Sequence, residues 1–416
     1  MTFDEVGIIN LQADLVDSGN IGVNYLLSGS SLIGTVNNVG RFYPASLELK
    51  SGSIVSRAEA RNQSLCIAPS SSYTYLGEEF KISAMLEAQN AAGDVTRNYV
   101  DGFAKLANSD LVPGAFYVFE ELAGPDSNLS TRRVLGGTPP AVLWPANTDP
   151  LAQRGIAALA GNLIFDRQSS GTPDGPFTGL SIGMNTADSD GAALELDIDL
   201  NDDLSNDVKK IGTEDFRYGR LLINNAYGPE TEPVGIGFTL EYFDANGNFV
   251  TNSNDSCTTL FYDASENDPA LRSLFYVPLS YQDNLDAGET EVEADAVLAD
   301  NDVTISVFEG ATVLRSGVDS DADNQNDDRP FQTSAPGEGN EGRVLIEFNL
   351  NDASLPFSLD FLSYDWRGGV GEADIYDEVP EGTNYTDNPR ATVEFGSYRG
   401  HDRVINWQEI FTGANP

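Results

Sequence analysis

Phe80-Lys81-Ile82-Ser83-Ala84-Met85-Leu86-Glu87-Ala88 is a run in which apolar and polar side chains largely alternate, and the sequence Asn90-Ala91-Ala92-Gly93-Asp94 follows it. Alternation with a period of two places the apolar side chains on one face of an extended strand and the polar ones on the other. Asparagine, glycine and aspartate accept the backbone conformations of tight turns. The run therefore predicts a β-strand with one buried face that ends in a turn.

The same strand-and-turn pattern recurs along the chain. Residues 238 to 243 lead into an Asn-Gly turn at 246 and 247, and residues 249 to 251 return, which is typical of a β-hairpin. Residues 303 to 314 predict a second hairpin, and residues 343 to 350 alternate again. Short strands at this spacing predict an all-β chain of tandem antiparallel β-sandwich (Ig-like) modules with long acidic loops.

One segment leaves its secondary structure open. Residues 151 to 159 are rich in alanine and leucine, which favour a helix. Gly155 lies inside the segment and Gly161 follows it, and glycine disfavours a helix interior. A strand is therefore an equally good interpretation of these residues.

Breaks in the strand pattern divide the chain. Residues 51 to 72 are polar and contain Pro69, and residues 201 to 212 are acidic and polar before a new strand run begins at Phe216. Residues 317 to 340 hold almost no apolar side chains, so we expect a long loop there. The predicted division is a first β module at residues 1–50, a second β-sandwich module at residues 51–212 and a C-terminal β-sandwich module at residues 213–416.

The charge balance limits the classes of partner. The chain has 65 acidic residues, 23 basic residues and one histidine, which gives a formal net charge of -42. Such a surface repels phosphate backbones and anionic membranes, so no nucleic-acid partner is expected. No apolar stretch is long enough to predict a membrane span. An oxygen-rich acidic surface suits hard cations such as calcium.

The sharpest chemical signal is the acidic segment at residues 319 to 328. Carboxylates at alternate positions of a curled loop can converge on one calcium ion, which takes about six to eight oxygen ligands. Pro330 stands where an EF-hand loop has its closing glutamate, so this is not an EF-hand. A solvated loop without a fixed ion is the alternative. The candidate ligands are Asp319, Asp321, Asp323, the carbonyl of Gln325, Asp327 and Asp328.

A weaker candidate for calcium is the segment that contains Asp197, Asp199, Asn201 and Asp203. The intervening Ile198 and Leu200 fit the buried face of a strand. In that interpretation the acidic side chains simply face water and hold no ion.

Cys66 and Cys257 are the only cysteines of the chain, and they are the candidates for one disulfide bond. If they pair, the closed loop would lower the entropy of the unfolded chain and so stabilise the fold by up to about 5 kcal/mol. Two separate buried thiols are the alternative, since sequence alone does not show proximity. We assign no catalytic residues, because nothing in the sequence selects one pair among its many carboxylates.

Residues 216 to 228, Phe-Arg-Tyr-Gly-Arg-Leu-Leu-Ile-Asn-Asn-Ala-Tyr-Gly, resemble a block in the C-terminal region of MshQ-type proteins. These proteins are encoded with the mannose-sensitive haemagglutinin (MSHA) type IV pilus. Further blocks resemble the family in the same order, at residues 3–7, 38–44, 73–80, 98–106, 174–177, 188–191, 255–258, 389–392 and 398–409. The chain departs from the family at residues 365–369, where Arg367 and Gly369 replace two acidic residues, so no ion site is expected there.

The resemblance implies a non-enzymatic, β-rich protein of the bacterial outer envelope or pilus, extracellular or at the cell surface. It implies a role in surface attachment or as a structural module, with other pilus or cell-surface proteins, and glycans or self-association, as partners. Three alternatives stay open at this stage. They are a self-assembling filament subunit, a calcium-dependent carbohydrate-binding module, and a polysaccharide-degrading enzyme that uses a carboxylate pair.

Overall fold

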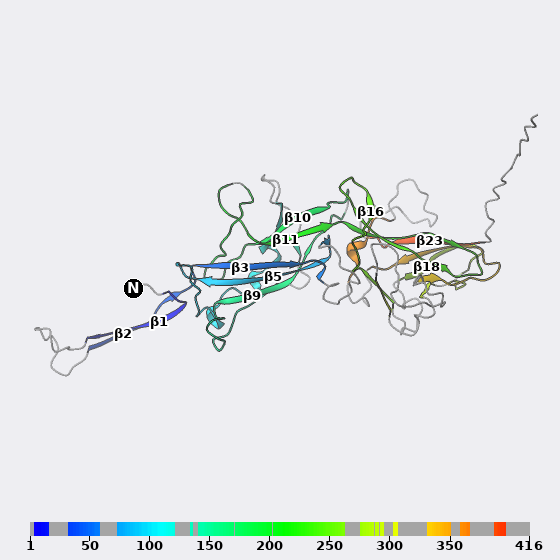
Figure 1. Ribbon diagram of the computed structural model, residues 1–416. Helices are drawn as coiled ribbons and strands as arrows, with labels where there is room; N and C mark the ends of the chain where they lie inside the picture. Colours follow the sequence, from blue (N-terminus) through cyan, green and yellow to red (C-terminus); the bar gives the residue numbers. More distant parts are fainter. Residues whose placement is uncertain are drawn as a thin grey trace, which may run out of the picture. The chain divides into compact units, whose positions relative to one another are not determined.

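The computed structural model describes a chain of two compact units. The first unit is Met1–Gly219 with Tyr242–Val250, and the second is Arg220–Glu241 with Thr251–Pro416. Figure 1 shows that both consist of strands and connecting loops. The described residues are 4–15, 32–58, 73–120, 134–135, 140–169, 171–201, 203–262, 275–286, 288–290, 292–294, 303–306, 331–350, 358–366 and 387–396.

Two sheets build the body of the first unit, and almost all of their strand pairs are antiparallel. One has the order β3-β5-β9-β7, with β8 also pairing with β9, and the other has the order β4-β11-β10-β6, in which only the β4–β11 pair is parallel. The strands of the first sheet are β3 (Ser46–Val55), β5 (Glu79–Gln89), β7 (Val134–Leu135), β8 (Ala141–Leu143) and β9 (Ile156–Phe165). Those of the second are β4 (Thr74–Tyr75), β6 (Phe116–Phe119), β10 (Phe177–Met184) and β11 (Lys209–Arg217).

Apolar side chains from the two sheets meet in one core. Phe80 on β5 and Phe165 on β9 each pack edge-to-face on Phe216 of β11, with ring centroids 5.4 Å and 5.1 Å apart. All three rings are fully buried, and burial of one such side chain is worth roughly 1.5–3 kcal/mol. Strand β5 alternates between buried and half-buried residues along most of its length, as its sequence predicts.

A close approach of two strands explains one glycine of this core. A Cβ atom on Gly52 of β3 would lie 2.3 Å from the carbonyl oxygen of Ile211 on β11. On the neighbouring Gly212 a Cβ atom would lie 3.1 Å from Ile54. The two sheets therefore come together at this edge only because the residues there lack side chains.

The segment at residues 151 to 159 divides into a turn and a strand. Its first residues form a turn, and β9 begins at Ile156 and runs to Phe165. Strand β9 pairs with β5 on one side and with β7 and β8 on the other. Of the two sequence interpretations, the strand is the one that the fold adopts.

A separate hairpin precedes the first sheet. Strands β1 (Gly7–Leu15) and β2 (Leu32–Phe42) pair antiparallel and form a two-stranded sheet of their own. Strand β3 extends on both sides of residue 50, and its pairing with β5 shifts register between Leu49 and Ser51. The predicted division of the chain at residues 50 and 212 stays a prediction.

A further three-stranded sheet has the order β12-β15-β16. Its strands are β12 (Gly219–Ile223), β15 (Phe238–Phe243) and β16 (Phe249–Thr251). Between β15 and β16, Asp244 Oδ1 accepts hydrogen bonds from the backbone N–H groups of Asn246 and Asn248, both at 2.9 Å, and Gly247 has a φ of 82°. The predicted hairpin at residues 238 to 251 is confirmed.

The second unit is also built from sheets. Its largest sheet has the order β13-β23-β22-β18, with β22 antiparallel to both of its neighbours. Two smaller sheets have the orders β14-β21-β19 and β17-β20. The strands are β13 (Ala226–Gly228), β14 (Val234–Gly235), β17 (Thr259–Tyr262), β18 (Phe275–Asp283), β19 (Val292–Ala294), β20 (Val303–Ser306), β21 (Phe331–Thr333), β22 (Gly342–Phe348) and β23 (Arg390–Phe395).

The all-β prediction is confirmed. The described residues contain strands and four short 3-10 helices, η1 (Asp101–Phe103), η2 (Asn108–Asp110), η3 (Pro113–Ala115) and η4 (Asp360–Leu362). No helix in this part of the chain has the length and apolar character needed to cross a membrane.

Candidate functional site

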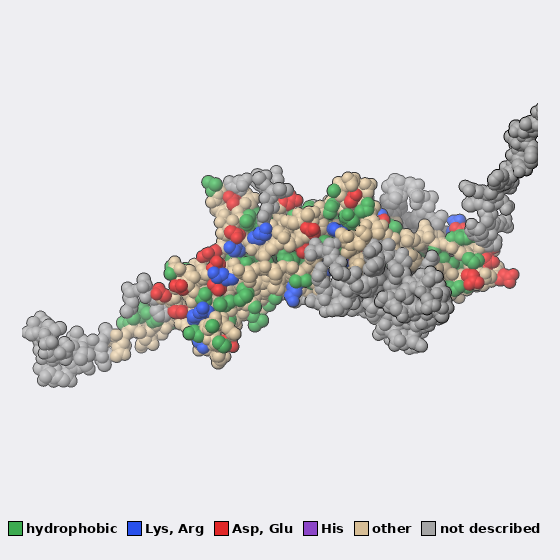
Figure 2. Space-filling view, in the orientation of Figure 1, with side chains coloured by type: hydrophobic (Ala, Val, Ile, Leu, Met, Phe, Trp, Pro, Cys, Tyr) green, Lys and Arg blue, Asp and Glu red, His purple; other side chains and the backbone are tan. Residues whose placement is uncertain are grey.

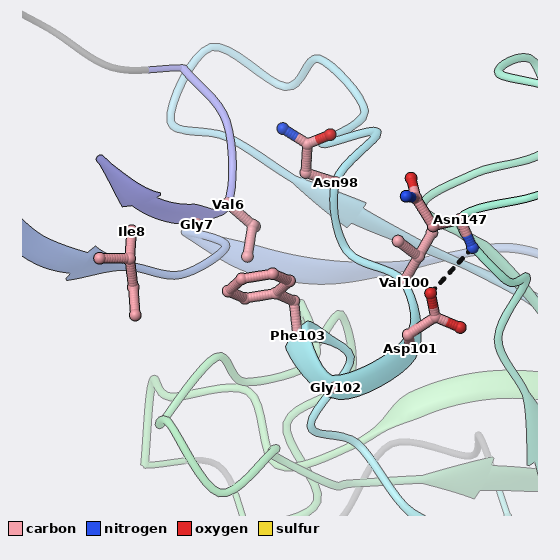
Figure 3. Close-up of a pocket in the computed structure, with 9 residues that line it drawn as sticks. All are labelled: Val6, Gly7, Ile8, Asn98, Val100, Asp101, Gly102, Phe103 and Asn147. Atoms are coloured by element: carbon pink, nitrogen blue, oxygen red, sulfur yellow. Dashed lines mark hydrogen bonds between the residues drawn. The ribbon is translucent and has the colours of Figure 1, made fainter. Parts of the chain in front are cut away.

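The first unit contains a groove of about 540 Å³. Three separate segments line it, as Figure 3 shows: the start of β1, the turn around η1, and the loop after β8. The lining residues are Val6, Gly7, Ile8, Asn98, Val100, Asp101, Gly102, Phe103 and Asn147. The volume lies within the range of about 300–1,000 Å³ that is typical of small-molecule sites.

Glu5 ties the first of these segments to the second. One of its carboxylate oxygens accepts a hydrogen bond from the Arg97 backbone N–H (3.2 Å), and the other accepts one from the Asn98 backbone N–H (3.0 Å). The Arg97 guanidinium in turn donates to the carbonyl oxygens of Ala152 (2.8 Å) and Arg154 (3.0 Å). These bonds position the start of β1 against residues 97 and 98.

Tyr99 fixes the turn beneath the groove. Its hydroxyl donates to Asp188 Oδ2 (2.6 Å) and accepts from the backbone N–H groups of Lys105 and Leu106, both at 3.0 Å. Its ring packs edge-to-face on Trp144 with centroids 4.6 Å apart. Tyr99 is fully buried, and burial, followed by the bond to Asp188, raises its pKa far above the usual value. Residues 99 to 106 are therefore wrapped around one buried hydroxyl.

Asp101 joins the second segment to the third. Its backbone is left-handed, with a φ of 45°, which is uncommon for a residue other than glycine. Its Oδ2 accepts a hydrogen bond from the Asn147 backbone N–H (3.0 Å), drawn as a dashed line in Figure 3. The side-chain Oδ1 of Asn147 accepts from Arg154 Nη1 (2.8 Å). The groove therefore has a rim held by hydrogen bonds.

Spare polar groups and apolar surface face the same groove. Within the described part of the chain, Asp101 Oδ1, the Asn147 side-chain NH₂ group and the Asn98 side-chain amide are in no hydrogen bond. Phe103 is 40% exposed, and Figure 3 shows its ring beside the Val6 side chain. This mixture suits a ligand that has one apolar face and several hydroxyl groups.

Comparison with protein families identifies both parts of the chain. Residues 5–214 match the third domain of DUF6701, and residues 217–410 match its fourth domain. This chain belongs to the DUF6701 family. The groove lies in the DUF6701 third domain.

Other comparisons add little to the family match. No curated protein matches the chain. A solved structure of the Escherichia coli adhesin FdeC is similar at 13% sequence identity, over 86% of this chain and 67% of that chain, with a TM-score of 0.19. A likeness at that TM-score supports no statement about the function of this chain.

The predicted calcium ligands fall into two groups. Asp319, Asp321, Asp323, Gln325, Asp327 and Asp328 lie outside the described residues, so calcium binding there stays a prediction. The weaker group is described, and its side chains bind backbone groups of their own loop or, for Asp197, a lysine of β11. Among all described residues, no three or more acidic, histidine or cysteine side chains converge in a way that would hold a metal ion.

The side chains of the weaker group already have partners. Asp197 pairs with Lys209 Nζ at 3.1 Å. Asp199 accepts from the backbone N–H groups of Asn201 (3.1 Å) and Leu204 (2.8 Å), and Asn201 Oδ1 accepts from the N–H of Asp203 (3.0 Å). A calcium ion would have to compete with these bonds. Calcium binding by this group stays a prediction.

The structure describes one of the two cysteines of the predicted disulfide bond. Cys257 is 1% exposed, in a turn where Asp255 Oδ1 accepts hydrogen bonds from the backbone N–H groups of Cys257 and Thr258, both at 2.9 Å. Cys66 lies outside the described residues. The pairing of Cys66 with Cys257 stays a prediction.

Sequence reasoning passed over a serine motif and the groove itself. Gly179-Leu180-Ser181-Ile182-Gly183 has the G-x-S-x-G spacing of a nucleophile elbow, which requires a strand-to-helix turn. Here Ser181 is fully buried in the middle of β10, between Phe119 of β6 and Thr213 of β11. The motif is therefore part of a central strand.

The groove residues Asn98 and Phe103 belong to a block that the family resemblance had included without a role.

Proposed function

We propose that this chain is a non-enzymatic module of the bacterial cell surface, associated with an MSHA-like type IV pilus and acting in attachment or as a structural part. The blocks that resemble MshQ-type proteins support this proposal, since they extend over almost the whole chain. The succession of two DUF6701 domains supports a multi-domain array.

The observation that carries the scaffold role is the use of the buried carboxylates of Asp188 and Glu214. Each holds the backbone or another strand in place and does not line the groove. Asp188 accepts from the backbone N–H groups of Asp190 and Ala192 as well as from Tyr99. Glu214 accepts from the hydroxyls of Ser56 (3.0 Å) and Thr74 (2.9 Å), which belong to segments far apart in sequence.

A buried ion pair also has a structural role. Arg57 and Glu78 are 1% and 6% exposed, with Arg57 Nε 3.0 Å from Glu78 Oε1. The Arg57 guanidinium also lies over the rings of Tyr73 and Tyr75, at 5.6 Å and 5.0 Å from the centroids. Breaking such a pair costs about 3–5 kcal/mol because one charge is left buried alone. Acidic side chains used in this way support a rigid scaffold rather than carboxylate catalysis.

The charge supports a choice of partner. On the face drawn in Figure 2, acidic side chains are scattered among basic ones over the described residues. With a net charge of -42, partners that are neutral or positively charged are favoured over anionic ones. Proteins of the pilus or envelope and uncharged glycans meet this condition.

An attachment assay tests the proposal. An in-frame deletion of the gene should reduce adhesion of the bacteria to surfaces or host cells, and the complementing wild-type gene should restore it. Surface biotinylation of intact cells should label the protein. A protein that stays unlabelled until the cells are lysed, or a deletion strain that adheres as well as wild type, would contradict the proposal.

Self-assembly into a filament is the second candidate, and the β1–β2 hairpin favours it. A two-stranded sheet is only marginally stable by itself. Leu11 and Val36 are a cross-strand pair on this hairpin, and they are 40% and 61% exposed. A donated strand from a second copy would pair with an edge of the hairpin. Light scattering after size exclusion tests this, because a monomer at high concentration contradicts self-assembly.

A further inference from the structure

We propose that the groove at Asn98, Asp101, Phe103 and Asn147 binds an uncharged sugar ring of a surface glycan. This inference rests on the proposed role in attachment, and it assigns that role a specific site. It requires no calcium ion, since none of the candidate calcium ligands lines the groove.

The shape and surface of the groove suit one sugar unit with its linkage. At about 540 Å³ the groove is large enough for a small ligand and open to solvent at its exposed rim residues. Val6 and Val100 are only 3% and 4% exposed and form an apolar floor, while Phe103 presents 40% of its surface. A pyranose ring has one face of C–H groups, and an exposed aromatic ring is the surface on which that face can pack.

The hydrogen-bonding groups match hydroxyl groups. A sugar hydroxyl both donates and accepts, so it needs acceptors and donors side by side. Asp101 Oδ1 is an acceptor, the Asn147 NH₂ group is a donor, and the Asn98 amide offers both. None of these atoms is in a hydrogen bond with a described residue. In contrast, the buried carboxylates of Asp188 and Glu214 in this unit are already bonded.

The groups are held in place before a ligand arrives. The left-handed backbone of Asp101 is a strained conformation, and such strain persists only where neighbouring bonds enforce it. Here the bond from the Asn147 backbone N–H to Asp101 and the Tyr99 hydroxyl beneath the turn enforce it. A rim fixed in advance lowers the entropy lost on binding.

Charge selects neutral sugars. Asp101 is the acidic side chain among the lining residues, and no lysine or arginine lines the groove. A sialic acid or sulfate group would therefore meet a carboxylate without a cationic partner, in a chain of net charge -42. Binding should decline from neutral to anionic glycans of the same backbone.

A glycan array followed by titration tests the inference on the full chain. The array should contain neutral oligosaccharides that end in glucose, galactose, mannose or N-acetylglucosamine, each beside its sialylated or sulfated form. The methyl glycoside of the best neutral sugar then serves as the soluble probe. Chelator should leave the binding unchanged.

Asn98→Ala is the most informative variant. The Asn98 side chain makes no hydrogen bond in the described part of the chain, so its removal should leave the melting temperature unchanged. Loss of one neutral hydrogen bond should weaken binding roughly three- to tenfold. Phe103→Ala should weaken it at least as much. Asn37→Ala, an exposed asparagine on β2, and Tyr227→Ala, an exposed aromatic residue of the second unit, are the matched controls and should bind as wild type.

The outcomes separate this inference from the proposed function. Binding of a neutral glycan that falls in Asn98→Ala and Phe103→Ala, and not in the controls, supports the groove. The inference is overturned if no neutral glycan binds, if anionic glycans bind better than neutral ones, or if Asn98→Ala binds as well as wild type. In those cases a deletion strain that still loses adhesion leaves the attachment role standing with a different contact surface.

Discussion

Replacement of Tyr99 by phenylalanine tests how the groove is supported, because it removes one oxygen atom and leaves the ring. The hydroxyl has three partners: the Asp188 carboxylate and the backbone N–H groups of Lys105 and Leu106. Trp144 packs on the ring and not on the hydroxyl, so packing should change little. The loss should therefore come almost entirely from polar groups left without a partner.

The size of the loss follows from the environment. Tyr99 and Leu106 are 0% and 2% exposed, so water does not replace the missing oxygen easily. A hydrogen bond to a charged group contributes roughly 1.5–3 kcal/mol, and a buried N–H without a partner costs roughly 1–3 kcal/mol. We expect Tyr99→Phe to lower the free energy of unfolding by about 3 kcal/mol or more. Tyr43→Phe is the control, since Tyr43 is 56% exposed, and it should change the free energy by less than about 0.5 kcal/mol.

The same variant gives a pH dependence with a definite sign. The folded state holds the pKa of Tyr99 far above its usual value, and the unfolded state should titrate near pH 10. Above about pH 10 the unfolded chain therefore binds fewer protons than the folded chain at this residue, and stability falls as pH rises. The stability conferred by Tyr99 is complete below pH 10. Above it, wild type should lose up to about 1.4 kcal/mol per pH unit relative to Tyr99→Phe.

Urea unfolding at several pH values, followed by tryptophan fluorescence and circular dichroism, measures both effects. A double-mutant cycle with Asp188→Asn should show a coupling energy of about 1 kcal/mol or more, because the two side chains are in direct contact. The reasoning is refuted if Tyr99→Phe unfolds within about 0.5 kcal/mol of wild type at pH 7, or if the two proteins keep the same difference from pH 8 to pH 11.

Three further variants test other parts of the chain. Gly52→Ala places a Cβ atom against the Ile211 carbonyl and should cost roughly 2 kcal/mol or more in urea unfolding, whereas Gly114→Ala, with nothing within 4 Å, should be nearly neutral. If the acidic loop at residues 319 to 328 holds calcium, millimolar calcium should raise the melting temperature of the ion-free wild-type protein, and Asp321→Ala should abolish this rise. A wild-type melting temperature that does not change with calcium would contradict calcium binding. If Cys66 and Cys257 are paired, mass spectrometry of the denatured, unreduced protein should show no alkylation by iodoacetamide. One alkyl group on each cysteine would exclude the disulfide bond.

The strands with a local signal were predictable, and those without one were not. Strand β5 alternates over a long run, so its buried face can be assigned from Phe80, Ile82 and Leu86 alone. Strand β9 carries small residues and Gly161, and its sequence fits a helix as well as a strand. It is a strand because β5 lies on one side and β8 on the other, and pairing of this kind depends on residues far away in sequence.

The groove was not predictable for the same reason. Its residues come from the start of β1, from residues 98 to 103 and from Asn147, and no short motif contains all three. Phe103 has the type of a core residue, yet it is 40% exposed and follows the left-handed turn at Asp101. That turn depends in turn on the bond from the Asn147 backbone, which sequence does not reveal.

Acidic residues at alternate positions can either stabilise turns or bind calcium, and the sequence pattern is the same in both cases. An aspartate that accepts a hydrogen bond from the N–H two residues later stabilises a turn, and a chain of such turns repeats with the same spacing as calcium ligands. Asp199 and Asp203 make this bond to Asn201 and Ser205, and hydrogen bonds from Ser205 lower the pKa of Asp203. Asp244 makes it to Asn246, and hydrogen bonds, first from Asn248, lower its pKa too.

The same carboxylate can therefore serve a turn or an ion, and the spacing does not decide between them. What decides is whether several carboxylates turn inward together, away from their own backbone. Asp199, Asp203 and Asp244 each turn toward a nearby N–H group, so an ion in their loops would have to displace those bonds. For the segment at residues 319 to 328 the deciding test is the calcium dependence of the melting temperature, compared between wild type and Asp321→Ala.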